Sequence, residues 1–304
     1  MKIEIIAEAF AIGSLILLAL GNLISSRKIS FSNYSLPQKA GYELNLVGWL
    51  FMGGFWFLQI EHYMYIRDPV NAFLCFLGLP FFCYLAYHEY LNIVWKTPYP
   101  ALAWLGSMTV VAGGIYFFVE RVPFLAGWFI NIVAHHSVYL LELFNHSVTL
   151  QSIDYGNGSL WYRPGSSHQE VIVGVSADWK DPMAPSVNII LACTALQSMI
   201  IFVGGVLCTK ADFKRRVYAF LATVPVIYFL NLIRNASIIY LTYSHIWGDE
   251  TFYYAHSLIG KGGSLFALIF LAIALFHYMP EMQNNILDLI DLPKRKNPNN
   301  SKSS

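Results

Sequence analysis

Cys193, Arg234 and His256 are the residues of this sequence whose types and spacing could do covalent chemistry. They lie in three successive apolar segments: ACTALQS at 192–198, NLIRN at 231–235 and FYYAHSL at 252–258. A thiol near an imidazole and a guanidinium makes a nucleophile, because the imidazole takes the thiol proton and the cation stabilises the thiolate. A fixed guanidinium also stabilises the oxyanion of a tetrahedral intermediate, and the imidazole can then protonate a leaving amine. The pattern predicts acyl transfer through a thioester.

Arg234 is an ionised side chain inside an apolar run, and a guanidinium cannot lose its charge by deprotonation. Asn231 and Asn235 share its i, i+3, i+4 helical face, which predicts a polar stripe turned toward protein or water rather than lipid. In the first segment, Gln197 is expected one helical turn below Cys193 on the same face. We therefore predict Gln197, Asn231 and Asn235 as substrate-binding residues beside the three catalytic ones.

Membrane-spanning helices must position these residues, because the composition leaves too little polar surface for a water-exposed fold. The 304 residues are 56% hydrophobic and only 12% charged, whereas soluble domains carry about 25% charged residues. Apolar stretches of about 20 residues predict an all-α, polytopic transmembrane bundle of about eight spans. We place the spans near residues 4–24, 44–61, 72–94, 101–119, 123–144, 188–208, 217–243 and 257–278.

These spans divide the chain into four parts. Residues 1–144 form five N-terminal spans, and residues 188–279 form the three catalytic spans. Between them, residues 145–187 are an extracytoplasmic loop, where Gly, Pro and Ser are mixed with the β-branched run Val171–Val175 and irregular or short β structure is expected. Residues 280–304 are a polar tail.

Lys and Arg set the predicted orientation, because positive charge concentrates on the cytoplasmic side. The basic clusters at 210–216 and 294–302 are predicted to be cytoplasmic. With eight spans, the N-terminus is then also inside, Lys96 is outside and the catalytic residues lie in the outer half of the membrane. The 25–43 loop is more basic than an outer loop should be. The chain is predicted to be a multi-pass cell-membrane protein with its active site near the extracytoplasmic face and its C-terminus in the cytoplasm.

The two motifs, followed by a histidine in the last span, resemble the archaeosortase/exosortase family of membrane transpeptidases. The resemblance covers roughly residues 185–278, and the multi-span layout agrees elsewhere. It implies Cys193 as nucleophile, Arg234 as the stabilising cation and His256 as the third residue, which is His or Arg in the family. His245, eleven positions before His256, stays open as an alternative for the third role.

The ACTALQS motif resembles the archaeosortase A branch of the family. This resemblance implies an archaeal source and membrane-anchored surface-protein substrates. Their C-terminal signal would consist of a PGF-containing motif, a transmembrane helix and a basic cluster. It further implies transfer of the cleaved protein to a membrane lipid as acceptor.

No cofactor or metal is expected, and a net charge of +1 argues against nucleic acid as a partner. An intramembrane metalloprotease, suggested by His88-Glu89 and His135-His136, lacks the H-E-x-x-H spacing. A transporter or channel using Arg234 as an intramembrane anion site remains the main alternative, and a plain assembly factor is another. Arg234 could also be structural, paired with Glu61, Glu89 or Glu142.

Overall fold

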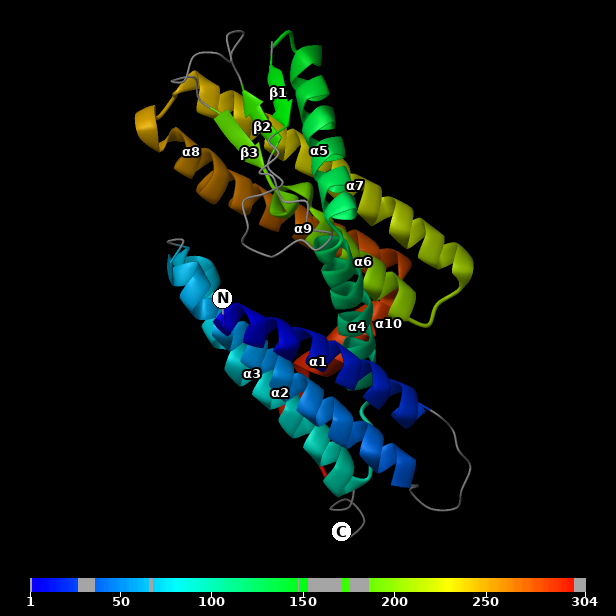
Figure 1. The fold of residues 1–304 in the computed structure, drawn as a ribbon. Helices are drawn as coiled ribbons and strands as arrows, with labels where there is room; N and C mark the ends of the chain where they lie inside the picture. The colour runs from blue at the N-terminus through cyan, green and yellow to red at the C-terminus, as the bar shows by residue number, and fades with distance from the viewer. Residues whose placement is uncertain are drawn as a thin grey trace. The chain divides into compact units, whose positions relative to one another are not determined.

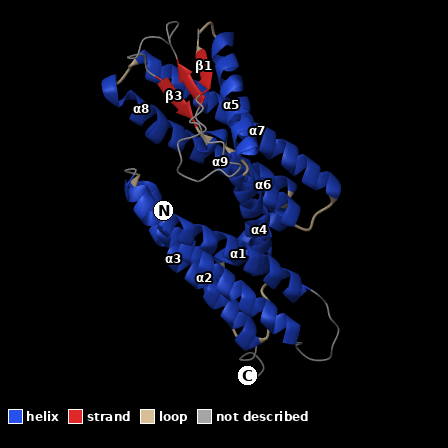
Figure 2. Cartoon of the chain, viewed as in Figure 1, coloured by secondary structure: helices blue, strands red, loops and turns tan. Residues whose placement is uncertain are grey.

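The structure is a computed structural model that describes residues 2–26, 36–65, 68–146, 148–152, 171–174 and 186–297. Helices dominate these residues, together with one small antiparallel sheet (Figures 1 and 2). Six of the described helices are long and apolar enough to cross a membrane, and a shorter apolar helix accompanies them. The predicted all-α polytopic bundle is confirmed. The chain folds into two compact units, residues 1–114 with 282–304 and residues 115–281.

The first unit is a helical bundle with its own core. It consists of α1 (Lys2–Ser26), α2 (Leu36–Tyr65), α3 (Pro69–Trp95), the first part of α4 (Pro100–Arg121) and most of α10 (Pro280–Ile290). Helices α1, α2 and α3 lie side by side (Figure 1). The core includes Leu18, Trp49, Leu85, Leu102 and Leu292. The C-terminal tail is therefore an integral part of this unit.

The tail contacts the connection between α3 and α4. Arg295 donates to the Thr97 carbonyl at 2.9 Å, and the Tyr99 hydroxyl donates to the Asp288 carbonyl at 2.7 Å. The sequence analysis placed Lys96, at this connection, outside the membrane and the tail inside. Direct hydrogen bonds cannot bridge a hydrocarbon core of about 30 Å. That combination is therefore wrong, and the two segments lie on the same side.

The second unit contains the predicted catalytic segments. Its helices are α5 (Pro123–Leu143), α6 (Leu196–Cys208), α7 (Phe213–Ser244), α8 (Thr251–Tyr253) and α9 (Lys261–Tyr278). Its antiparallel sheet has the order β1 (Thr149–Ser152), β2 (Val171–Gly174) and β3 (Ser186–Ile189). Val171 pairs with Ser152 on one side and Ile189 on the other. The predicted β structure is thus confirmed at Val171–Gly174, while Val175 and the rest of that loop, 153–170 and 176–185, lie outside the described residues.

An arginine fork joins the beginning of α7 to the end of α9. Arg215 donates from Nη1 and Nη2 to the two carboxylate oxygens of Glu281 at 2.7 and 2.8 Å, and from Nε to the Tyr278 carbonyl at 3.0 Å. These hydrogen bonds hold the pKa of the Glu281 carboxyl below its usual range. These hydrogen bonds hold the beginning of α7, which carries the basic residues Lys214, Arg215 and Arg216, against the end of α9.

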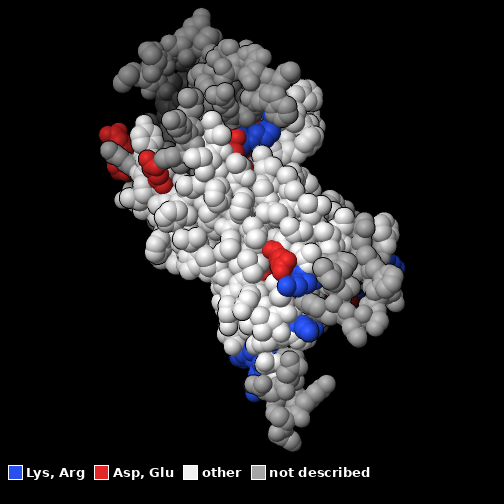
Figure 3. Space-filling view, turned by 60° about the horizontal axis from the view of Figure 1, so that its bottom comes forward, with Lys and Arg blue, Asp and Glu red and all other residues white. Residues whose placement is uncertain are grey.

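Charged side chains are sparse on the surface. Figure 3 shows a broad area without Lys, Arg, Asp or Glu between a few charged groups. Large apolar side chains are exposed instead: for example, 76% of the surface of Phe124 and 69% of that of Phe270 is exposed. Such a surface is stable where lipid replaces water, which agrees with the multi-pass membrane character predicted from composition.

The predicted span at 188–208 is not one continuous helix. Strand β3 leads into a 3₁₀-helix, η1 (Leu191–Thr194), and α6 begins only at Leu196. Between them Ala195 adopts the left-handed conformation, with φ 56° and ψ 12°. Helix α6 has 13 residues, or about 20 Å of length, which is shorter than a full crossing. The prediction of one continuous helix was therefore wrong. Because the helix breaks at Ala195, Cys193 lies in the turn that precedes α6.

Candidate active site

Cys193 lies in η1, which local hydrogen bonds hold in a tight turn. Its N–H donates to the Ile190 carbonyl at 2.8 Å. The Thr194 hydroxyl donates to the Leu191 carbonyl at 2.7 Å and accepts from the N–H of Leu196 at 3.3 Å. The left-handed residue that follows η1 is an alanine, and this conformation costs a residue with a Cβ about 1–2 kcal/mol. Contacts from elsewhere must therefore stabilise the turn.

Two side-chain amides from α7 supply such contacts. Asn231 and Asn235 both donate from Nδ2 to the main-chain carbonyl of Cys193, at 2.8 and 2.9 Å. Both asparagines are buried, with 8% and 2% of their surfaces exposed. Helix α7 is continuous across 231–235, so the two amides and Arg234 share one helical face, as the i, i+3, i+4 spacing predicts.

Arg234 belongs to the same cluster. Its Nη1 donates to Asn235 Oδ1 at 3.4 Å, and its Nε donates to the Gly260 carbonyl at 3.3 Å. Its charge interacts electrostatically with the thiol of Cys193. A Cβ at Gly260 would lie 3.1 Å from Arg234 Nε, so a glycine at this position gives the guanidinium close access to the backbone. The structure thus brings two of the three predicted catalytic residues together.

The structural alternative for Arg234 required a carboxylate partner. Among the described residues of the second unit, no carboxylate forms an ion pair with Arg234, although Glu142 of this unit is described. Glu89 accepts a hydrogen bond from Asn92 at 2.8 Å. The same described residues contain no group of three or more His, Cys, Asp or Glu side chains placed to hold a metal ion.

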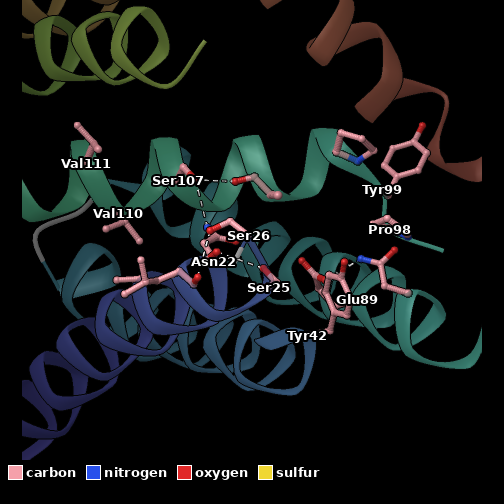
Figure 4. Close-up of a pocket in the computed structure, with 15 residues that line it drawn as sticks. Asn22, Ser25, Ser26, Tyr42, Glu89, Pro98, Tyr99, Ser107, Val110 and Val111 are labelled. Carbon is pink, nitrogen blue, oxygen red and sulfur yellow. Dashed lines mark hydrogen bonds between the residues drawn. The ribbon is translucent and has the colours of Figure 1, made fainter. Parts of the chain in front are cut away.

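A cavity of about 480 Å³, lined by both apolar and polar side chains, lies within the first unit (Figure 4). Asn22 donates to the Ser107 hydroxyl at 3.3 Å and accepts from Asn45 at 3.0 Å. Glu89 and Asn92 line the same cavity, and only 1% of the Glu89 surface is exposed. The sequence analysis did not group these residues, because they come from four helices and share no motif. Their hydrogen bonds explain how a carboxyl is tolerated inside an apolar helix.

His256 lies in a π-helical segment, Tyr254–Gly260, that the sequence did not predict. The helical run extends over Gly248–Tyr278. His256 therefore lies inside this run, whereas the sequence analysis expected the span to begin only at residue 257. Its half-buried ring stacks on Phe252, with centroids 5.3 Å apart and 9° between the planes. The carbonyl that Arg234 contacts belongs to the last residue of the same π-helical segment. Such segments occur frequently at functional sites.

Gln197 is not placed as predicted. The left-handed Ala195 interrupts the helix between Cys193 and Gln197, so the two residues do not share a helical face, and Gln197 is exposed. The next residue, Ser198, lines the cavity beside Arg234 instead. His245, the alternative third residue, is exposed and ends α7 in the left-handed conformation.

This second cavity, of about 350 Å³, lies between η1, α6, α7 and α9. Asn231 contributes a side-chain amide to its lining and Arg234 contributes the guanidinium. Small side chains form much of its remaining lining: Ala192, Ala195, Ser198, Ser237, Ala255, Gly260, Gly263, Ser264 and Ala267. The sequence analysis missed this set; the signal that could have indicated it is the cluster of Gly260, Gly262 and Gly263. Small side chains leave room for a ligand next to the guanidinium.

Fold and site together define an integral membrane protein in which a cysteine, an arginine and two asparagines are grouped between helices. The chain belongs to the transmembrane exosortase family, whose family model matches residues 5–275. It is also similar to Archaeosortase A of Haloferax volcanii (strain ATCC 29605 / DSM 3757), with 22% identity over 282 residues, covering 83% of this chain and 86% of that protein. No solved structure matches the chain. The predicted resemblance to membrane-embedded sorting transpeptidases is confirmed.

Proposed function

We propose that this protein is a cysteine transpeptidase that uses Cys193 to cleave the C-terminal, PGF-type sorting signal of membrane-anchored surface proteins and transfers the cleaved proteins to a membrane lipid. The observation that carries the proposal is the position of Asn235. This one side chain donates to the Cys193 carbonyl and accepts from Arg234, so the main chain of Cys193 and the guanidinium of Arg234 belong to one hydrogen-bonded cluster. The family and its similarity to an archaeosortase support the substrate class and an archaeal source.

The chemistry follows from the roles that these groups can take. The Cys193 sulfur attacks the carbonyl carbon of the scissile peptide bond, while His256 accepts the thiol proton. Arg234 stabilises the oxyanion of the tetrahedral intermediate. The C–N bond then breaks, and His256 gives its proton to the leaving amine. A nucleophilic group of the acceptor lipid then attacks the thioester carbonyl, the C–S bond breaks, and the proton of that group returns to the Cys193 thiolate.

We place this site near the extracytoplasmic face. Arg215 marks the basic end of α7, and Arg234 follows nineteen residues later on the same helix. This separation corresponds to about 28 Å of α-helix, close to the hydrocarbon thickness of about 30 Å. If the basic end is cytoplasmic, Arg234 therefore lies near the opposite surface. A substrate anchored by a C-terminal helix presents its cleavage site at that depth by lateral diffusion.

The small-residue cavity is the proposed binding site for the substrate residues at the scissile bond. Gly263 lines this cavity and Gly262 does not, yet a Cβ at either position would meet nothing within 4 Å. We expect Gly263→Leu to fill the cavity and to lower kcat/KM by roughly tenfold to hundredfold. Gly262→Leu brings the same gain in helix propensity, about 0.5–1 kcal/mol, and should leave kcat/KM near the wild-type value. Equal activity of the two variants would contradict the assignment of the cavity.

Labelling from the extracytoplasmic side tests the nucleophile and its location together. In a Cys83→Ala, Cys208→Ala background, Cys193 and the buried Cys75 are the thiols that remain. A membrane-impermeant thiol reagent added to intact cells should label Cys193 and stop processing of a reporter surface protein that carries a PGF-containing signal. Labelled residues are identified by peptide mass spectrometry. Continued processing after complete labelling of Cys193 would overturn the proposed nucleophile.

A further inference from the structure

The carbonyl of Cys193 is the feature of the site that the proposed mechanism does not use. It lies near the end of η1, where carbonyl groups lack partners within the helix. The left-handed Ala195 then turns the chain into α6. An unpaired buried carbonyl would be costly, but this one accepts two hydrogen bonds, from Asn231 and Asn235.

We propose that Asn231 and Asn235 are positioning residues, which together form an amide clamp on the main-chain carbonyl of Cys193 and fix its thiol relative to Arg234. This inference rests on the proposed function. It replaces the substrate-binding role that the sequence suggested for the two asparagines. The side-chain amide of each asparagine already donates a hydrogen bond to the main-chain carbonyl of Cys193. Both side chains therefore hold the backbone of the proposed nucleophile in place.

The geometry shows why a pair of amides suits this task. The two asparagines are four residues apart on α7, so their side chains are neighbours on one face of a rigid helix. A carbonyl oxygen has two lone pairs, and the distances of 2.8 and 2.9 Å show that both are engaged equally. Two hydrogen bonds from one helix fix the direction of the carbonyl as well as its distance. They therefore orient the residue that carries the thiol.

The clamp also couples the nucleophile to the cation. Asn235 Oδ1 accepts from Arg234 Nη1 at 3.4 Å, while Arg234 Nε is directed to the Gly260 carbonyl at 3.3 Å. Asn235 therefore contacts Cys193 with one end of its amide and Arg234 with the other. Movement of η1 away from α7 would separate the thiol from the guanidinium. Reaction geometry is sensitive to such shifts, since a displacement of about 1 Å can cost about a hundredfold in rate.

The test compares Asn231→Ala, Asn235→Ala and the double variant, with separate measurement of kcat and KM on a PGF-signal reporter. Each single variant leaves one amide on the carbonyl, so we expect kcat to fall about fivefold with KM unchanged. The double variant leaves the carbonyl unpaired, and its kcat should fall by about a hundredfold or more, which exceeds the product of the single effects. Thr242→Ala is the matched control, because Thr242 is a buried polar residue of α7 whose hydroxyl, among the described residues, donates to the Ile238 carbonyl of its own helix.

The outcomes separate the clamp from the proposed function. If Cys193→Ala still processes the reporter, the proposed function fails and the clamp with it. If Cys193→Ala is inactive while the double variant keeps the wild-type kcat, only the clamp is overturned. A rise in KM at constant kcat would assign the asparagines to substrate binding instead. Should the double variant not fold, the single variants still decide, because the clamp predicts an effect on kcat and substrate binding predicts one on KM.

Discussion

Cys193→Ala is expected to abolish processing of the sorting signal. Alanine removes the sulfur that would form the thioester. Loss of a catalytic nucleophile lowers kcat by about 10⁵–10⁶-fold in comparable covalent enzymes, which is below detection in cells. The expected result is accumulation of the full-length reporter in the membrane, measured by its size and its retained C-terminal helix.

Cys208→Ala is the matched control for this substitution. Cys208 is the last residue of α6, the 13-residue helix that follows η1, and among the described residues it has no hydrogen-bonded partner from α7. Its loss should leave processing unchanged. Both substitutions remove one sulfur from a partly buried position, so their effects on folding are similar, and thermal unfolding can check this. Normal processing by Cys193→Ala would remove the covalent mechanism and leave only the helix bundle.

The helical content and the polar face of α7 could be predicted because they depend on local pattern. Long apolar runs need helices in a membrane, and an Arg between two asparagines at helical spacing places all three on one face. The structure has this face at Asn231, Arg234 and Asn235. Which atoms the face contacts was not readable from spacing, since the Cys193 carbonyl comes from a different segment. The contact with this carbonyl is what supports the proposed positioning role of the two asparagines.

The break before α6 could not be predicted, because it contradicts local preference. Alanine is the best helix former, yet Ala195 is left-handed and stops the helical run that its apolar neighbours suggest. Long-range contacts override the preference here: β3 fixes the chain before η1, and α7 fixes the Cys193 carbonyl. The misplacement of Gln197 follows directly, because its predicted position assumed an unbroken helix.

The surroundings of His256 and the contacts of the C-terminal tail also could not be predicted from local sequence pattern. A π-helical turn differs from an α-helix by one inserted residue and has no sequence signal, so the surroundings of His256 were not foreseen. The contacts of Arg295 with the α3–α4 connection join residues about 200 positions apart. Charge counting treats each loop separately and cannot detect such contacts, which is why the predicted alternation of loops was wrong at this point.

Arg234→Lys is expected to lower kcat by about 10²–10³-fold, although it keeps the positive charge. The guanidinium directs Nε to the Gly260 carbonyl and Nη1 to Asn235, and a lysine ammonium cannot reproduce this planar, two-directional geometry. The cation would then be misplaced relative to the oxyanion, and loss of one fixed oxyanion donor typically costs this factor. The measurement is the rate of thioester formation on Cys193, followed by mass spectrometry after acid quenching.

Arg215→Lys provides the comparison that makes the result specific. Arg215 lies near the beginning of the same helix, nineteen residues before Arg234. Its guanidinium donates two hydrogen bonds to the carboxylate of Glu281. It should keep nearly the wild-type rate, because the pair is partly exposed and such pairs contribute little to stability. A transporter with an intramembrane anion site depends mainly on charge, so it would tolerate Arg234→Lys and would not need Cys193. Full thioester formation by Arg234→Lys would show that the geometry of this guanidinium is not required, and the role of Arg234 would then reduce to its charge.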